Sequence, residues 1–219
     1  MIAMILAAGR GERLRPITES IPKALVEVRG RSLLERHLDH LQAAGIETVV
    51  INLGWHGQQI ADRIGSGRDY GLNVIYSPEG DDILETGGGI HRALPLLGRD
   101  PFLVVNADVY TDMSVPPAEP AGNDLGHLVL VPRPAHKAHG DFDLRDGRIC
   151  DADNEDAAYT FSGIAVYRPE FFADCQPGRF PLAPMLRAAA RAGRMAGSLY
   201  EGLWEDVGTP ERLAELNRL

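Results

Sequence analysis

Short apolar segments alternate with helical segments along the first half of the chain, and this alternation restricts the fold more than any other feature. Residues 2–7 form an apolar run that ends in small residues, as expected of a central parallel strand buried on both faces. Residues 32–44 carry leucines at helical spacing, and Ser32 with Glu35 forms a capping-box pattern at their start. Further apolar strands are expected at residues 48–53, 74–76 and 102–105. The order predicts an α/β fold, a Rossmann-like, mostly parallel sheet with helices on both faces.

The pattern changes after a linker rich in proline and glycine that begins at Pro116. Strand-like segments dominate from there, at residues 128–131, 141–145, 148–151 and 159–167. Helices are expected only near residues 182–192 and 211–219, the second with Thr209 as its cap and Pro210 at its first position. We expect one domain over residues 1–219, in which mixed strands of the half 116–219 form a lid on one edge of a sheet built by residues 1–115. No repeat indicates a C-terminal β-helix domain.

Charge and composition exclude several classes of protein. The 219 residues include 22 Lys and Arg against 31 Asp and Glu, so the net charge is 22 − 31 = −9, which disfavours a nucleic-acid partner. The longest apolar run spans residues 1–8, well short of the roughly 18 residues that cross a bilayer, and no basic segment precedes it. Two cysteines, Cys150 and Cys175, are too few for a disulfide scaffold. We expect a cytoplasmic protein without a membrane partner, as a monomer or a homodimer.

The segment directly after the first strand, residues 7–16 with the sequence AAGRGERLRP, indicates a phosphate-binding loop. Small residues and two glycines let backbone N–H groups approach a phosphate, and Arg10, Arg13 and Arg15 supply positive charge. The dinucleotide fingerprint and the Walker motif both fail here, since Leu14 stands where the former needs glycine and no Gly-Lys-Ser/Thr occurs. The alternative interpretation is a solvated surface loop.

Lys23 and Asp108 are further candidates for chemistry. Lys23 follows Pro22, which holds the preceding backbone extended, so the lysine is presented from a stiff segment; the alternative is a surface lysine. Asp108 follows an apolar strand, at the sheet edge where a carboxylate is a natural ligand for Mg²⁺; the alternative is a cap or turn residue. Asp206 precedes the last helix and is open to the same two interpretations.

These segments together resemble the sugar-1-phosphate nucleotidylyltransferase family. The similarity runs through residues 6–16 and 22–25 and continues at residues 84–89, 105–108, 161–164 and 204–209, so it covers nearly the full chain. Within the family, the compact length and the sequence LETGGG at residues 84–89 look most like the bacterial N-acetylmuramate α-1-phosphate uridylyltransferases of cell-wall recycling. The chain departs from most relatives at Glu85, where they have glycine, and residues 81–83 add a position before it.

The resemblance implies a nucleotide-diphospho-sugar transferase (GT-A-like) fold and an enzyme that joins UTP to a hexose 1-phosphate, releasing pyrophosphate, with Mg²⁺ as cofactor. It implies that residues 1–115 bind the nucleotide and residues 116–219 the sugar. The implied catalytic residues are Arg15 for the leaving pyrophosphate, Lys23 for the phosphates and Asp108, which with Asp206 holds the metal. The implied nucleotide-binding residues are Leu6, Ala7, Ala8, Gly9, Gly11, Arg13, Arg15, Glu79, Thr86, Gly87 and Asn106. The implied sugar-binding residues are Gly140, Asp141, Ser162 and Gly163.

The resemblance places Glu79 in the family's base-reading region, and an ionised carboxylate only accepts hydrogen bonds. A ring N–H, as in uracil, thymine or guanine, fits it, so we expect UTP with dTTP or GTP tolerated and CTP and ATP rejected. Alternatives are a mannose- or heptose-1-phosphate guanylyltransferase and a catalytically silent nucleotide-sugar sensor. His136 and His139, beside Asp141, invite a transition-metal site, but no helix is expected there to hold its geometry.

Overall fold

The computed structural model describes residues 1–80, 84–151 and 157–218. Its helices are α1 (Leu33–Ala43), α2 (Gly57–Ile64), α3 (Glu85–Leu97), α4 (Ala183–Arg191) and α5 (Pro210–Leu216). The strands of its large sheet are β1 (Ala3–Leu6), β4 (Thr48–Leu53), β5 (Asn73–Pro78), β6 (Phe102–Asn106), β8 (Gly126–Pro132), β9 (Asp143–Arg145), β10 (Arg148–Cys150), β11 (Tyr159–Tyr167) and β12 (Met195–Leu199). Two small ribbons pair β2 (Glu27–Val28) with β3 (Arg31–Ser32) and β7 (Val109–Thr111) with β13 (Trp204–Asp206).

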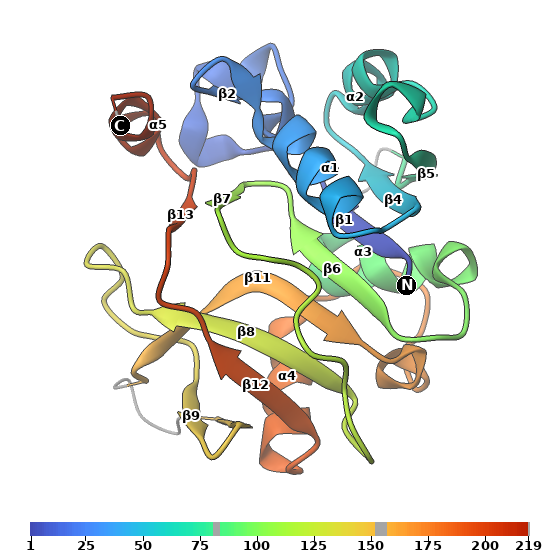
Figure 1. Ribbon diagram of the computed structural model, residues 1–219, viewed down its shortest axis with the longest axis vertical. Coiled ribbons are helices and arrows are strands. Elements are labelled where there is room, and N and C mark those ends of the chain that lie inside the picture. The colour runs from blue at the N-terminus through green and yellow to red at the C-terminus, as the bar shows by residue number, and fades with distance from the viewer. Residues whose placement is uncertain (81–83, 152–156, 219) are drawn as a thin grey trace.

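The large sheet has nine strands in the order β5-β4-β1-β6-β11-β8-β12-β10-β9. The first four are all parallel, as the alternating sequence predicts. The strands of the second half join this sheet at β6, beginning with the antiparallel strand β11, and they continue it sideways with mixed directions (Figure 1). The expected mixed strands on one edge are therefore present, and they extend the sheet itself. The extra position at residues 81–83 lies outside the described residues.

Side-chain alternation along the buried strands produces two cores, one on each face of the sheet. In β1, Ala3 and Ile5 face the core that also contains Leu34 and Leu38 of α1. Met4 faces the opposite core, which is covered by α3 and α4 (Figure 1). Burial on both faces explains why β1 reads as an uninterrupted apolar run. No helix within the described ranges has the length and apolarity required to cross a membrane.

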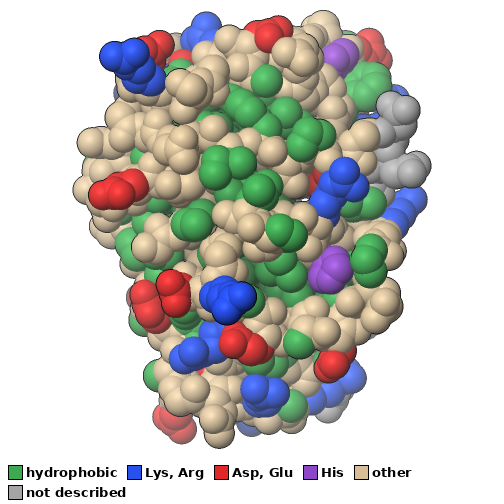
Figure 2. All heavy atoms as spheres, turned by 90° about the vertical axis from the view of Figure 1, so that its right-hand side faces the viewer, with side chains coloured by type: hydrophobic (Ala, Val, Ile, Leu, Met, Phe, Trp, Pro, Cys, Tyr) green, Lys and Arg blue, Asp and Glu red, His purple; other side chains and the backbone are tan. Residues whose placement is uncertain are grey.

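Charged side chains of both signs are mixed on one face of the protein (Figure 2). On the face that lies on the right-hand side of Figure 1, Lys and Arg side chains are interspersed with Asp and Glu (Figure 2). Apolar side chains gather toward one end of the same face (Figure 2). The positive charges on this face therefore form no continuous basic patch.

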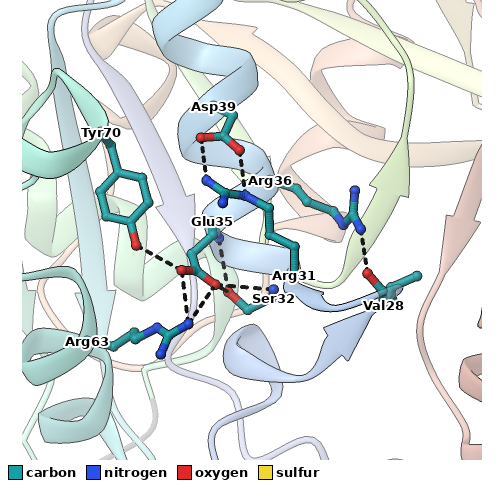
Figure 3. Close-up of polar contacts among 8 residues, drawn as sticks. All are labelled: Val28, Arg31, Ser32, Glu35, Arg36, Asp39, Arg63 and Tyr70. Carbon is teal, nitrogen blue, oxygen red and sulfur yellow. Dashed lines mark hydrogen bonds and ion pairs between the residues drawn. The ribbon is translucent and has the colours of Figure 1, made fainter.

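The capping box predicted at residues 32–35 is confirmed at the start of α1. The Ser32 Oγ accepts from the Glu35 N–H, and the Glu35 carboxylate accepts from both the N–H and the hydroxyl of Ser32 (Figure 3). Tyr70 Oη donates to the same carboxylate at 3.0 Å, and Arg63 pairs with it at 3.2 Å. Burial raises the pKa of Glu35, but the hydrogen bonds from Ser32 and Tyr70 outweigh burial and hold that pKa below its ordinary value.

Replacing the cap tests how much this network stabilises the protein. Ser32→Ala removes a helix cap, which costs about 1–2 kcal/mol and lowers the melting temperature by several degrees. The stabilisation from ionised Glu35 is present at neutral pH and is lost as pH falls below 4.5 and the carboxyl protonates. Thermal melts should therefore show a gap between wild type and variant that narrows on acidification. Ser20→Ala, at an exposed serine, is the matched control, and an equal loss there would contradict the assignment.

Candidate functional site

A cavity of about 570 Å³ lies at the carboxyl ends of the parallel strands. The end of β1, Asn52 of β4, Glu79 after β5 and Asn106 of β6 all line it, which is the edge where open α/β sheets bind ligands. The predicted nucleotide-binding residues that line it are Leu6, Ala7, Ala8, Gly9, Gly11, Arg13, Glu79, Thr86 and Asn106. Lys23 and Asp108 line it as well.

The loop after β1 is shaped by contacts with its neighbours. The Ala7 N–H donates to the Asn52 Oδ1 at 2.6 Å, and the Trp55 N–H donates to the Ala8 carbonyl at 3.2 Å. Gly11 has a φ of +62°, and a Cβ there would lie 2.9 Å from Thr18 and 3.1 Å from Lys23. Only glycine fits both this conformation and this space, so the second glycine of the loop is required.

Arg15, the arginine predicted to contact the leaving group, is exposed and does not line the cavity. The short 3₁₀ turn Glu12–Leu14 buries Leu14 and ends before Arg15. Arg13 and Arg15, on either side of Leu14, therefore lie in different places. Arg10 and Arg13 line the cavity, and the Arg10 guanidinium lies 5.5 Å from the ring centroid of Trp55. Positive charge therefore reaches the cavity from these two arginines.

Asn52 and Glu79 form a buried pair beneath the loop. The Asn52 Nδ2 donates to the Glu79 Oε1 at 2.7 Å, and the Leu84 N–H donates to the Glu79 Oε2 at 3.1 Å. Both side chains are at least nine-tenths buried, with exposed fractions of 4% and 6%. A single pair thus connects the phosphate loop, through the Ala7 N–H, to the start of α3.

Three consecutive glycines in the first turns of α3 allow three close approaches. A Cβ at Gly87 would meet the Phe180 ring at 2.5 Å, and one at Gly88 would meet the Gly178 carbonyl at 2.2 Å. A Cβ at Gly89 would lie 2.5 Å from the Glu79 Oε1. Gly87 is accordingly buried behind Phe180, away from the cavity that Thr86 lines. The run of glycines therefore serves packing.

The departure at Glu85 has a structural explanation. Glu85 has a φ of +59°, a left-handed conformation that glycine adopts most easily. Its carboxylate accepts from the Arg179 Nε at 2.8 Å, so the larger side chain is held by an ion pair from the second half of the chain.

Lys23 and Asp108 form the shortest ion pair that faces the cavity, with 2.5 Å between Lys23 Nζ and Asp108 Oδ2. The two side chains are 15% and 30% exposed, so the pair is partly shielded from water. His37 of α1 lies beneath this turn, against the carbonyl groups of Asn106 and Val109. Burial lowers the pKa of His37 to about 4, so the imidazole below Asp108 is neutral at pH 7.

Asp206 is brought next to Asp108 by the β7–β13 ribbon, in which Asp206 pairs with Val109. The Val207 N–H also donates to the Asp108 carbonyl at 2.9 Å. The Asp206 carboxylate accepts from Arg212, and the His136 Nε2 lies 3.6 Å away. Burial raises the pKa of the neighbouring Glu205, and the charge of Asp206 adds to this shift. Backbone pairing thus brings Asp108 and Asp206, nearly a hundred positions apart, to neighbouring places at one end of the sheet, where Asp108 lines the cavity and Asp206 lies outside its lining.

The residues predicted to bind sugar lie beside this cavity and do not line it. Gly163 has a φ of +80°, and a Cβ there would lie 2.6 Å from the Asn106 side chain, so β11 packs directly against the cavity wall. The Trp204 Nε1 donates to the Ser162 carbonyl at 2.9 Å. Asp141 accepts from the Phe161 N–H at 2.9 Å, and Gly140 lies against the Ala157 and Tyr159 carbonyls.

Sequence reasoning missed Asn52, whereas Arg10 is one of the three arginines that the sequence predicts at the phosphate-binding loop. The signal for Asn52 is a single polar residue near the end of an otherwise apolar strand, which is also what a strand end at a surface looks like. His136 and His139 lie in a turn, and no group of three or more His, Cys, Asp or Glu side chains is gathered in the described ranges as a metal cluster.

Comparisons with known proteins agree on a group of relatives. Residues 3–113 match the family model described as a MobA-like NTP transferase domain. The chain is 48% identical to an N-acetylmuramate alpha-1-phosphate uridylyltransferase of Neisseria meningitidis serogroup B, covering 100% of this chain and 98% of that protein. It is 37% identical to the enzyme of the same name from Caulobacter vibrioides, covering 100% and 96%.

A solved structure is also similar. It is a putative glucose-1-phosphate thymidylyltransferase from Bacillus anthracis in complex with a sucrose, with a TM-score of 0.84 at 19% identity, covering 100% of this chain and 94% of that one. At this identity the likeness concerns the fold, and it confirms the predicted α/β class.

Gly89→Ala tests the close packing under the cavity. Alanine normally stabilises a helix interior by about 1 kcal/mol relative to glycine. Here the added Cβ meets the buried Glu79 carboxylate at 2.5 Å and the Asn52 amide at 3.1 Å, so we expect a lower melting temperature. A thermal melt measures whether the melting temperature of the variant falls or rises relative to wild type. An increase would mean that the Asn52–Glu79 pair moves without cost.

Proposed function

Because this chain belongs to the sugar-1-phosphate nucleotidylyltransferase family, we propose that it transfers the uridylyl group of UTP to N-acetylmuramate 1-phosphate, forming UDP-N-acetylmuramate and pyrophosphate. The observation that carries this is the 48% identity to an N-acetylmuramate alpha-1-phosphate uridylyltransferase over the whole chain. A second relative of the same name supports it. Such a reaction suits cell-wall recycling in the cytoplasm.

The reaction needs no protein nucleophile, because the phosphate of the sugar is itself anionic. One of its oxygens attacks the α-phosphorus of the nucleotide, and the bond from that phosphorus to the oxygen bridging to the β-phosphate breaks. Pyrophosphate leaves with the electron pair of that bond. Catalysis then comes from placing the reactants and stabilising the charge that moves.

The phosphate loop supplies the contacts to the triphosphate. Its backbone lies at the carboxyl end of β1, and Arg10 and Arg13 face the cavity beside it. We therefore assign the leaving pyrophosphate to these two arginines in place of Arg15. Lys23, whose Nζ lies 2.5 Å from Asp108, would stabilise the negative charge on the α-phosphate and the sugar phosphate during the reaction.

The donor set at one end of the sheet fits a divalent cation, which members of this family generally use. Asp108 and Asp206 offer carboxylate oxygens across the β7–β13 ribbon, and Mg²⁺ takes one or two protein carboxylates with the rest of its oxygen shell from water and phosphate. Asp108 and Asp206 would hold Mg²⁺, whose charge would neutralise the α-phosphoryl oxygens.

Glu79 is placed to select the base. Its carboxylate already accepts from Asn52 and from the Leu84 N–H, and each oxygen retains a further lone pair for a ring N–H. Uracil offers that donor, whereas cytosine and adenine present an acceptor at the corresponding ring nitrogen. Asn52 keeps the carboxylate in place.

A substrate panel tests the proposal directly. Pyrophosphate release is measured for UTP, dTTP, GTP, CTP and ATP with N-acetylmuramate 1-phosphate, N-acetylglucosamine 1-phosphate and mannose 1-phosphate. We expect the highest kcat/KM for UTP with N-acetylmuramate 1-phosphate and no turnover of CTP or ATP. A preference for GTP with mannose 1-phosphate would favour a guanylyltransferase, and no turnover with nucleotide-sugar binding would favour a sensor.

Lys23→Met keeps the stem of the side chain and deletes its charge. We expect kcat to fall about 10²-fold, since one preorganised charge contact to the reacting phosphates is lost, with a small change in melting temperature. Steady-state kinetics and a thermal melt measure both. Arg68→Met, at an exposed arginine, is the control for charge, and normal turnover by the Lys23 variant would return Lys23 to a surface role.

Asp206→Asn removes one negative charge with little change of shape. If Asp206 holds the metal, the variant requires more Mg²⁺ and turns over far more slowly, because an amide oxygen binds Mg²⁺ less well than a carboxylate. Activity is titrated against Mg²⁺ beside a thermal melt, with Asp39→Asn, which breaks an exposed pair with Arg31, as control. Unchanged Mg²⁺ dependence at full activity would contradict the assignment.

A further inference from the structure

A basic turn at residues 133–139 of the second half has no role in the reaction above. It contains Arg133, His136, Lys137 and His139. The Arg133 Nη1 donates to the Ala138 carbonyl at 2.9 Å, and the Lys137 N–H donates to the Pro134 carbonyl at 3.0 Å. The turn is therefore closed on itself and holds its side chains in a defined arrangement.

Two contacts link this turn to the strand β13 and to β11, and the turn itself lies outside the lining of the cavity. On one side the His136 Nε2 lies 3.6 Å from Asp206, whose strand pairs with the residue after Asp108. On the other side Asp141 accepts from the Phe161 N–H at 2.9 Å. Phe161 lies two positions before Gly163, which packs against Asn106 of the cavity wall. The turn thus connects β13 to β11 in the region next to the cavity.

Lys137 places its ammonium group beside Asp141, the residue that joins the turn to β11. Its Nζ lies 3.1 Å from the Asp141 Oδ2, and its side chain is 34% exposed. An ammonium group has three N–H donors, and the contact to Asp141 uses one. Asp141 also accepts from the Phe161 backbone, so the acid that orients the lysine is itself fixed.

Carboxylates lie around the turn, and three of them have basic partners: Asp108 pairs with Lys23, Asp206 with Arg212 and Asp141 with Lys137. Asp108, Asp206, Glu205 and Asp141 all lie in this part of the protein. The phosphate of a sugar substrate has partners in Lys23 and a divalent cation, but a second anionic group on the same sugar would meet these carboxylates and be repelled. A cation on the sugar side is therefore needed for a substrate that carries such a group.

We propose that Lys137 binds the carboxylate of the lactyl ether of the sugar. Lys137 would thereby select a hexose 1-phosphate that carries this carboxylate over the same hexose 1-phosphate without the lactyl group. This rests on the proposed function, in which N-acetylmuramate 1-phosphate is the acceptor. The two substrates to compare are N-acetylmuramate 1-phosphate and N-acetylglucosamine 1-phosphate, which differ by the lactyl group. Arg10, Arg13 and Lys23 lie at the phosphate loop and serve the phosphates of both.

The test measures kcat/KM for both sugar phosphates, with UTP and Mg²⁺, in wild type and variants. Lys137→Met should lower kcat/KM for the carboxylated substrate by about 10- to 100-fold, the usual effect of losing one charge-assisted hydrogen bond. It should leave kcat/KM for N-acetylglucosamine 1-phosphate unchanged. Lys137→Arg keeps the charge and should retain most of the preference. Arg145→Met, on an exposed position of β9 at the far edge of the sheet, is the matched control.

The outcomes separate the two proposals. Wild-type enzyme that uses both sugars equally would contradict the proposed acceptor itself. Wild type that prefers the carboxylated sugar, with a Lys137→Met variant that keeps this preference or loses both activities in parallel, would overturn only the role of Lys137. Lys137→Gln repeats the measurement if the methionine variant melts at a lower temperature than wild type.

Discussion

Parallel pairing of β1 with β4 on one side and β6 on the other is the constraint on which the rest of the site depends. Ile5 is in register with Ile51 of β4 and with Val105 of β6. Because these strands run the same way, their carboxyl ends meet at one edge of the sheet. Strand pairing alone therefore places the loop after β1, Asn52 and Asp108 at the same edge, and no direct contact among the three is needed. The apolar surfaces on both faces, covered by α1 and α2 on one side and α3 and α4 on the other, stabilise this arrangement.

In and beside the cavity, several acidic side chains pair with basic ones, and two of these pairs join distant parts of the chain. Lys23 pairs with Asp108, and Arg212 pairs with Asp206. Glu85, in its left-handed conformation, pairs with Arg179. A carboxylate that is partly removed from water needs such a partner. A charged ligand that enters the cavity would therefore compete with the Lys23–Asp108 pair for its partners.

The second half of the chain acts on the first through the sheet and through a few specific contacts. β11 adds to β6, and Gly163 of β11 lies against Asn106 where any larger residue would clash. The Trp204 Nε1–H donates to the Ser162 carbonyl and so connects β13 to β11. The Phe180 ring packs against Gly87 of α3. One continuous sheet therefore joins the two halves of the chain, and the relative position of the halves is set by backbone pairing.

Local patterns in the sequence by themselves determined the strand at residues 2–7, the capping box of α1 and the glycine-rich loop. These features depend on groups a few positions apart, so local spacing is enough to predict them. Order along the chain also determined the parallel half of the sheet, because crossovers between parallel strands have one handedness. The match to the nucleotidylyltransferase pattern, and with it the activity, could be read at this level as well.

Only the tertiary structure decided which of these residues face the cavity. Arg13 does and Arg15 does not, because burial of Leu14 in a short turn sends the two arginines to different places. Asn52 carries no local signal, yet its amide joins the loop to Glu79. The Lys23–Asp108 pair joins residues 85 positions apart. Such contacts exist only once the strands are paired and the helices packed, since short-range spacing says nothing about which side chains a folded chain brings within hydrogen-bond distance.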